Sequence, residues 1–453
     1  MEAPTSPSAT DGRAAAPQQR GRFGLGVLLV ALAAALFAVA FRSGLKLVWQ
    51  HLAGAPDVVT AMTRAPLWLR LCLPAVGGLF AGLLGLILAR PSSGGGGAGG
   101  VGDVMEAVVL GRVKLSMRST LLKSAASWCA ILLGGSLGRE GPLIQFGGAA
   151  GKLVSTRLGL SLSSARLLIA AGTAAGFAAA YNTPFAAVLF VLEVVTGVVV
   201  LDAIVPALVA TVIASAVTRA AVGAGPLYGQ RGFIEGSTVE LVAFAALGLC
   251  TAVFAQGFMR LLSFGEDAFR RSRLPLPWRP ALGGLLAGAM VAVMPEVAGN
   301  GFEPLNALLD GRLATGFVAL LLFGKAFATT ASVSSGSPGG VFTPALLIGG
   351  AVGVLFASAL SALGLGHSPV GGYALVGMAA ATAATTHAPL MAAVMVFELT
   401  GDYAIALPLL LATSLATLAS RALRRDSIYT AELRQRGVGW EVTMDGRRND
   451  EEA

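Results

Sequence analysis

The segment Gly-Arg-Glu-Gly-Pro at residues 138–142 places an acid and a base between two apolar stretches, residues 125–133 and 143–154. Charged side chains in such surroundings are costly and mark functional sites in membrane proteins. The glycines permit a tight turn, and Pro142 suits the first turn of a helix. Because the free amides and the dipole of a helix start attract anions, we expect Glu140 to be a tethered anion that competes with a dissolved one.

The composition indicates the kind of protein that must position this segment. The chain is 55% hydrophobic, 12% charged and contains 60 glycines, which is typical of a polytopic membrane protein with closely packed helices. The net charge of +8 lies mostly in loops and tails, without interleaved aromatic residues, so we expect no nucleic-acid partner. Cys72, Cys129 and Cys250 are isolated in apolar runs, and we expect neither a metal site nor a cofactor.

Three regions are expected along the chain. Residues 1–22 are polar and predict a disordered tail, residues 23–436 a transmembrane domain, and residues 437–453 a cytoplasmic tail. The first helix is expected from Phe23 to Ala40. It could pass for a signal peptide, but no convincing small-residue cleavage site follows before Arg42, so a retained helix is favoured.

The helices are expected to differ in length. Residues 67–88 predict a long helix, whereas the glycine-rich residues 92–100 do not, and a short helix is expected from Asp103 to Leu110 with Asp103 as its cap. Apolar segments such as 184–197 and 389–400 fall short of the ~20 residues that a span requires. Short, glycine-interrupted segments predict broken, tilted helices that end inside the membrane.

Positive charge predicts the orientation. The loop at 112–123, the loop at 270–279 and the C-terminal region are basic, which places both termini in the cytoplasm of a cell-membrane protein. Lys152, Arg157 and Arg166 argue against this orientation, because they lie between segments expected outside.

An internal repeat relates two parts of the chain. Residues 172–193 resemble residues 377–398 at an offset of 377 − 172 = 205, and residues 138–148 resemble 340–350 at an offset of 340 − 138 = 202. Low-complexity Ala/Gly sequence could imitate a repeat. Two motif pairs with nearly one offset favour instead a transporter of two related halves, with its site where the halves meet.

The combined motifs resemble the CLC family of chloride channels and chloride/proton antiporters. The resemblance is to members of that family that have no C-terminal CBS domains. These motifs are GREGP at 138–142, SSGSPGG at 334–340, GGVFTP at 339–344, Asn-Thr-Pro at 182–184 and Ser-Ile-Tyr at 427–429. The resemblance implies an all-α polytopic homodimer with one anion pathway in each subunit. In that fold, the starts of broken helices converge on a mid-membrane anion site.

The same resemblance assigns roles to residues. Glu140 would be the gating glutamate, and Tyr429 would supply an inner hydroxyl. Their alternatives are a structural acid paired with Arg139 and an interfacial aromatic anchor. The expected anion-binding residues are Gly99, Gly100, Val101, Arg139, Glu140, Gly141, Val341, Phe342 and Tyr429.

Two departures from the family pattern bear on function. The first filter motif of the family, Gly-Ser-Gly-Ile-Pro, is here residues 98–102, where Gly99 replaces the serine, and this leaves the preferred anion open. Val194 stands where antiporters commonly carry an inner proton-accepting glutamate. Since valine carries no proton, a passive channel is favoured, although exchange remains conceivable if water reaches Glu140.

Other polar residues have structural interpretations. Glu193 and Glu398 are related by the repeat, and each is expected to accept hydrogen bonds from backbone amides, unless one of them pairs with Lys325.

Two further functions are compatible with parts of the sequence. Serines at 334, 335 and 337 with His387 could form an intramembrane serine hydrolase. His387 occupies the position that corresponds to Asn182 in the repeat, which predicts a structural turn, so we do not expect an enzyme.

A fluoride exporter is a nearer alternative. The sequence therefore predicts a glutamate-gated chloride channel in a lipid bilayer, with a chloride/proton antiporter as the alternative.

Overall fold

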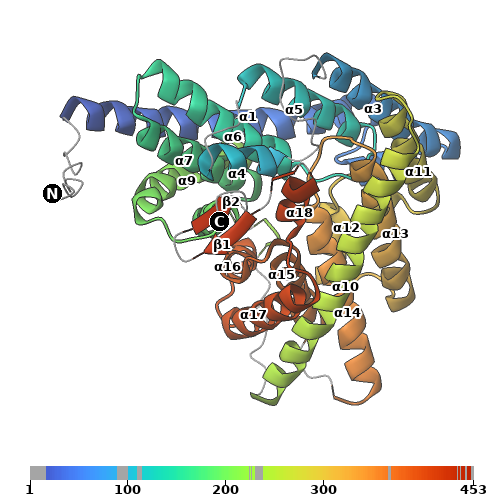
Figure 1. Ribbon diagram of the computed structural model, residues 1–453. Helices are drawn as coiled ribbons and strands as arrows, with labels where there is room; N and C mark the ends of the chain where they lie inside the picture. The colour runs from blue at the N-terminus through green and yellow to red at the C-terminus, as the bar shows by residue number, and fades with distance from the viewer. Residues whose placement is uncertain are drawn as a thin grey trace, which may run out of the picture.

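The computed structural model describes residues 17–88, 100–109, 115–223, 225, 227–229, 238–365, 369–435, 437–438, 440–443 and 446–449. The described chain is almost entirely helical (Figure 1). The elements up to residue 222 are α1 (Pro17–Ala53), α2 (Val58–Arg64), α3 (Leu67–Leu88), α4 (Gly100–Val109), α5 (Met117–Leu132), α6 (Glu140–Arg157), α7 (Leu162–Tyr181), α8 (Pro184–Leu189), the π-helix η1 (Phe190–Thr196) and α9 (Leu201–Val222).

The remaining elements follow in a similar order. They are α10 (Thr238–Arg271), α11 (Trp278–Val293), the short 3-10 helix η2 (Pro295–Val297), α12 (Phe302–Leu309), α13 (Thr315–Ser334), α14 (Phe342–Ala362), α15 (Val370–Thr386), α16 (Pro389–Thr400), α17 (Ala406–Leu423), α18 (Ile428–Gln435) and the strands β1 (Trp440–Thr443) and β2 (Gly446–Asn449).

The outer surface of the helices is apolar. Large side chains such as Leu36, Phe80, Val253 and Phe323 are exposed on α1, α3, α10 and α13. Eight described helical segments are long and apolar enough to cross a membrane. Lipid accommodates such a surface and requires helices to satisfy their own backbone groups. The prediction of an all-α polytopic membrane protein is confirmed.

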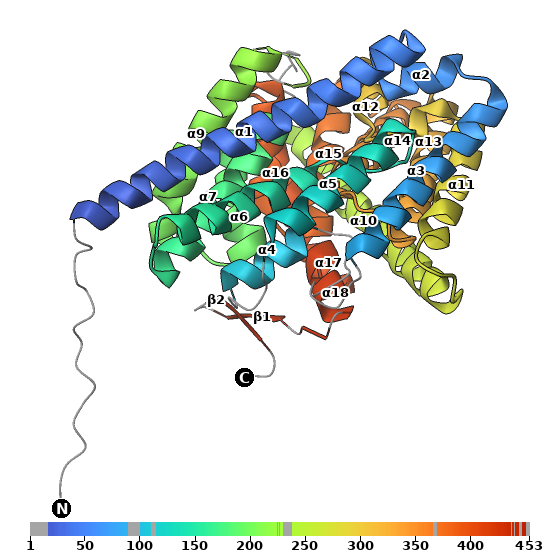
Figure 2. The ribbon, with the colours of Figure 1, turned by 90° about the horizontal axis from the view of Figure 1, so that it is seen from above.

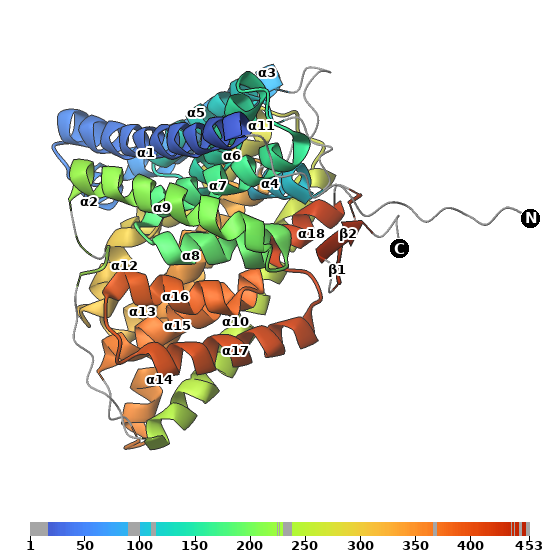
Figure 3. The same ribbon diagram turned by 90° about the vertical axis from the view of Figure 1, so that its left-hand side faces the viewer.

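The predicted repeat relates four pairs of described helices. The starts of α4 and α12 differ by 302 − 100 = 202, and those of α6 and α14 by 342 − 140 = 202. The starts of α8 and α16 differ by 389 − 184 = 205, and those of α9 and α17 by 406 − 201 = 205. In Figure 3, α9, α8, α16 and α17 follow one another in that order, with the related helices α8 and α16 adjacent at the centre.

Close glycine contacts pack each half in the same way. A Cβ on Gly147 of α6 would overlap the carbonyl oxygen of Gly172 in α7, and a Cβ on Gly349 of α14 would overlap that of Gly377 in α15. These glycines therefore let the two backbones approach without intervening side chains. Helix α1 runs across α5, α6, α7 and α9 and covers the α6–α7 packing (Figure 2).

Some predicted boundaries differ from the structure. Helix α1 runs from Pro17 to Ala53, so the last residues of the predicted tail are helical and the first helix extends beyond its predicted end at Ala40. Residues 437–453, predicted as a tail, contain the hairpin β1–β2, which pairs Trp440 with Asn449 and lies beside α18 in Figure 1. Helix α3 spans the predicted residues.

The predicted cap of the short helix is wrong. Helix α4 begins at Gly100, so Asp103 lies within its first turn. Its carboxylate accepts hydrogen bonds from Lys123 Nζ at 2.7 Å and Gln145 Nε2 at 2.9 Å. Asp103 thus ties α4 to α5 and α6, and these tertiary contacts outweigh its preference for the cap position.

Candidate functional site

The two halves meet at a backbone bridge. Gly138 N donates to Gly340 O, and Gly340 N donates to Gly138 O, both at 2.7 Å. These residues immediately precede α6 and α14, and each occupies the same place in the repeat. The reciprocal pair therefore marks a local two-fold relationship between the halves and brings the starts of the two helices together.

The carboxylate of Glu140 lies at the start of the opposite helix. Glu140 is 1% exposed, although it is the first residue of α6. Its Oε1 accepts from the Phe342 amide at 2.8 Å and from the Thr343 amide at 3.4 Å. A carboxylate in a helix N-terminus uses donors that have no partner within the helix. Glu140 thus occupies the kind of position that a free anion would take.

The bridge glycines leave room for this carboxylate. A Cβ on Gly138 or on Gly340 would overlap the carboxylate oxygens of Glu140. The carboxylate therefore packs directly against both glycines of the bridge. Only the absence of a side chain at these positions allows Glu140 to reach the amide of Phe342.

Two hydroxyl groups extend the hydrogen bonding of Glu140. Thr343 Oγ1 donates to Glu140 Oε2 at 3.1 Å, and the Tyr181 hydroxyl lies 2.8 Å from Thr343 Oγ1. Neither residue is predicted as a site residue from the sequence. Thr343 lies inside the motif at 339–344, which could have drawn attention to it. Tyr181 precedes the Asn-Thr-Pro turn, and only the fold places it beside residue 343.

The start of α4 lies against the first turn of α6. A Cβ on Gly100 would lie 2.7 Å from the carbonyl oxygen of Gly141 and from Cβ of Gln145. Val101 is 2% exposed and belongs to the same apolar core. Three helix starts, those of α4, α6 and α14, are therefore gathered in one place. Gly99 lies outside the described residues.

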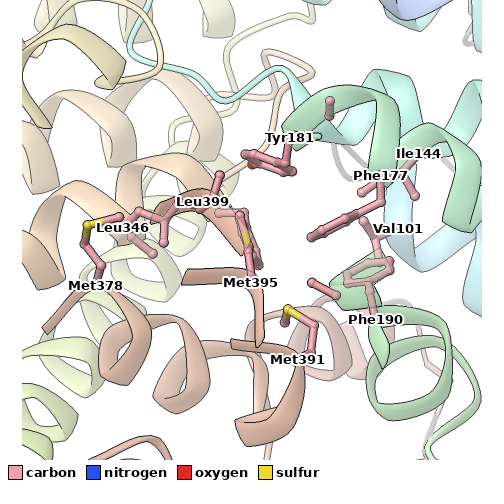
Figure 4. Packing of buried hydrophobic residues seen from close by; sticks show 14 of the residues in the cluster. Val101, Ile144, Phe177, Tyr181, Phe190, Leu346, Met378, Met391, Met395 and Leu399 are labelled. Atoms are coloured by element: carbon pink, nitrogen blue, oxygen red, sulfur yellow. The ribbon is translucent and has the colours of Figure 1, made fainter. Parts of the chain in front are cut away.

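Tyr429 joins this place through aromatic contacts. Its ring contacts Phe190 edge-on at 6.3 Å, Phe190 stacks on Phe177 at 4.7 Å, and Phe177 contacts Phe342 edge-on at 5.6 Å. Figure 4 shows Phe177, Phe190 and Val101 close together in the cluster of buried hydrophobic residues. The aromatic residues thus form a continuous apolar path from α18 to the start of α14.

Arg139, Gly141 and Val341 complete the predicted set. Arg139 caps α6, is partly buried, and has no hydrogen-bond partner for its Nε within the described chain. Gly141 is buried in the first turn of α6, and Val341 caps α14. The structure therefore places Arg139 and Gly141 beside Glu140 at the start of α6, and Val341 beside Phe342, whose amide donates to Glu140.

Each of the repeat-related glutamates, Glu193 and Glu398, accepts hydrogen bonds from the half of the protein that contains the other. Glu193 accepts from the amides of Leu390 and Met391 at 3.3 and 2.7 Å, at the start of α16. Glu398 accepts from the amides of Phe185 and Ala186 at 3.0 and 2.8 Å, at the start of α8. These contacts match the predicted acceptance of hydrogen bonds from backbone amides.

Lys325 does not pair with either glutamate. Its side chain is fully buried, and Nζ donates to Val297 O at 2.9 Å and Gly299 O at 2.8 Å. The alternative interpretation, an ion pair of Lys325 with Glu193 or Glu398, is therefore wrong. Lys325 and Lys123 differ by 325 − 123 = 202, and each fastens the region of a short helix, α12 or α4.

The geometry of a serine hydrolase is absent from the described serines and His387. Ser334 Oγ donates to Leu262 O, and Ser335 Oγ donates to Ser332 O. His387 Nε2 lies 3.2 Å from the hydroxyl of a different serine, Ser420. His387 and Asn182 adopt left-handed backbone angles, φ 59° and 60°, so the predicted structural turn is confirmed.

Fold and site together define a multi-pass helical membrane protein of two related halves built around a buried carboxylate. The family model for the voltage-gated chloride channel matches residues 77–421. A ClcB-like chloride channel protein from Ralstonia nicotianae is 40% identical over 414 residues, covering 89% of this chain and 95% of the relative. The voltage-gated ClC-type chloride channel ClcB of Salmonella typhi is 33% identical, covering 88% and 96%. The protein belongs to the CLC family.

Solved structures share the fold. A slow cyanobacterial Cl⁻/H⁺ antiporter has a TM-score of 0.81 at 24% identity and covers 92% of this chain and 98% of its own. A CLC-type fluoride/proton antiporter has a TM-score of 0.76 at 23% identity and covers 91% and 98%. At these identities the likeness concerns the fold alone. Members of the CLC family are channels and transporters, so the hydrolase alternative is set aside.

Proposed function

We propose that the protein carries chloride or similar small monovalent anions across a membrane, with Glu140 as the gate. The observation that supports this most is the carboxylate of Glu140 on the Phe342 amide at the start of α14. An anion entering the site would lose water and take up these amide donors as the carboxylate leaves. No covalent chemistry is needed, and modest binding at each position lets the ion move on.

The finer proposal is a passive channel. Strict exchange needs a titratable relay to bring protons to the gate through the apolar interior. Val194, at the position where antiporters commonly have an inner glutamate, is 1% exposed. Its neighbour Glu193 is engaged with the amides of α16 and is poorly placed to substitute. The protein would act as a homodimer with one pathway in each subunit and both termini in the cytoplasm.

The alternative is a chloride/proton antiporter of the same fold, which is the activity named for the cyanobacterial protein that shares this fold. The test is the reversal potential of proteoliposomes under a chloride gradient, with and without a pH gradient. A channel gives the chloride equilibrium potential in both cases. A shift with the pH gradient would contradict the channel and establish proton coupling.

Fluoride needs a separate measurement, because Gly99 leaves the anion preference open. Efflux of chloride and of fluoride from loaded proteoliposomes is compared at equal concentration. Chloride efflux at least as fast as fluoride efflux supports the proposal. Fluoride efflux alone would make the protein a fluoride exporter.

A further inference from the structure

Two buried hydroxyl groups lead from the gate carboxylate into α7. Thr343 Oγ1 lies 3.1 Å from Glu140 Oε2 and 2.8 Å from the Tyr181 hydroxyl. Tyr181 is 3% exposed, and Thr343 is 2% exposed. Water therefore has little access to these groups, and each hydroxyl depends on its protein partners.

The ionised state of Glu140 determines the direction of both hydrogen bonds. A carboxylate only accepts hydrogen bonds, so the single proton of the Thr343 hydroxyl must point to Glu140. The oxygen of Thr343 then accepts at its contact with Tyr181, whose hydroxyl donates. Hydrogen bonds in such a chain strengthen one another, and bonds to a charged acceptor are the stronger kind.

The ring of Tyr181 is held in place. Its centroid lies 5.1 Å from that of Phe177 and 5.6 Å from that of Phe342. Tyr181 and Phe177 both belong to α7, and Figure 4 shows the two rings in the buried apolar cluster. The hydroxyl is thus presented to Thr343 by packing on both halves of the molecule and needs little ordering to donate.

We propose that Tyr181 and Thr343 form a hydroxyl latch that holds the ionised Glu140 gate closed and sets the pH at which it opens. The proposal rests on the gating role of Glu140. Protonation of Glu140 removes the charge and leaves an acid whose own proton competes for Thr343, so the latch favours only the closed, ionised state. Tyr181 acts through Thr343 as a positioning residue.

Other groups also act on the charge of Glu140. Tyr228, Lys325 and Tyr429 interact with it electrostatically from the segment before α10, from α13 and from α18. Arg139 precedes it in the chain. The test must therefore separate the latch from this background, and conservative hydroxyl changes do so because they leave every charge in place.

The test measures chloride flux against pH in proteoliposomes. Thr343→Val keeps the shape of the side chain and removes the hydroxyl, and we expect the midpoint of activation to move up by about one pH unit or more. Tyr181→Phe should move it upward by less, because Thr343 can still donate. Thr343→Ser, which keeps the hydroxyl, should retain the wild-type midpoint.

The double variant Tyr181→Phe/Thr343→Val identifies the latch. Since Tyr181 acts through Thr343, the double variant should match Thr343→Val alone. The latch would be overturned if Tyr181→Phe shifted the midpoint equally in the wild type and in the Thr343→Val background. Unchanged midpoints in the single variants Thr343→Val and Tyr181→Phe would also overturn it. Glu140→Gln is measured in the same assay. If its flux does not depend on pH while the Thr343→Val and Tyr181→Phe variants keep the wild-type midpoint, the latch alone is rejected. A wild-type profile in Glu140→Gln would reject both the latch and the gate.

Discussion

Glu140 and Phe342 occupy the same place in the two halves of the repeat, yet they play opposite parts. The offset is 342 − 140 = 202, and Glu140 supplies the carboxylate that accepts from the Phe342 amide at 2.8 Å. Each begins a helix beside the bridge of Gly138 and Gly340. The near-symmetric backbone thus brings two helix starts together, and the difference in side chains places the anionic group of one at the amide of the other.

Gly340→Ala should disturb the gate directly. The new Cβ would overlap the carboxylate of Glu140, so we expect the side chain to leave the start of α14. Chloride flux at neutral pH should rise, and its dependence on pH should weaken. Gly316→Ala is the control, because a Cβ there meets nothing within 4 Å. A wild-type flux and pH profile in Gly340→Ala would contradict the close packing of the carboxylate on the bridge.

Glu193→Gln and Glu398→Gln should destabilise the protein by similar amounts. Each variant replaces a charged acceptor of two backbone amides, and a hydrogen bond to a charged group contributes about 1.5–3 kcal/mol. The partial exposure of both sites places the expected loss toward the lower value. Thermal denaturation in detergent measures it. Glu296→Gln, at a partly buried residue whose side chain makes no hydrogen bond in the described chain, is the control. A loss in only one of the two variants would argue against their equivalent roles.

Lys123→Met should be strongly destabilising, because it removes the ammonium group that lies 2.7 Å from the buried carboxylate of Asp103. Breaking a buried pair in this way costs about 3–5 kcal/mol. The double variant Asp103→Leu/Lys123→Met removes both charges and should recover part of the loss.

The control for this pair is Arg270→Met, whose partner Asp267 is exposed. A surface pair of this kind contributes about 0–1 kcal/mol. Denaturation midpoints are compared for all three variants. A Lys123→Met loss no larger than that of Arg270→Met would show that the buried pair does not fasten α4.

Tyr429→Phe tests the predicted inner hydroxyl. Removal of one hydrogen-bond donor should weaken chloride binding about 2- to 10-fold in calorimetric titrations, without loss of thermal stability. Tyr429→Ala should weaken it further, because it also removes the ring that contacts Phe190. Tyr403→Phe, at an exposed ring, is the control. Unaltered affinity in both Tyr429 variants would remove this residue from the anion site.

The sequence identifies the parts of the site whose residue types reveal their chemistry. An acid at 140 in apolar surroundings, a proline in the first turn and a repeated motif predict a carboxylate at a helix start. Helix α3 is equally clear, because residues 67–88 form one long apolar run. These features are local in the chain, and their physical meaning does not depend on the rest of the fold.

Contacts between distant segments are less predictable. Tyr181 and Thr343 are 162 positions apart, and neither residue type by itself indicates a partner. Asp103 resembles a cap, but Lys123 and Gln145 hold it inside α4. From the sequence, an ion pair of Lys325 with a glutamate is an acceptable arrangement, whereas in the structure its ammonium group donates to two backbone carbonyl groups. In each case tertiary packing chooses among locally acceptable partners.

The most direct test of the central claim is the pH profile of chloride flux through Glu140→Gln in proteoliposomes, compared with the wild type. The variant keeps the size of the side chain and removes the charge that competes for the amide of Phe342. We predict that chloride flux persists in the variant and no longer depends on pH, whereas wild-type flux rises as protonation releases the carboxylate. A Glu140→Gln protein that retains the wild-type pH profile would contradict the assignment of Glu140 as the gate.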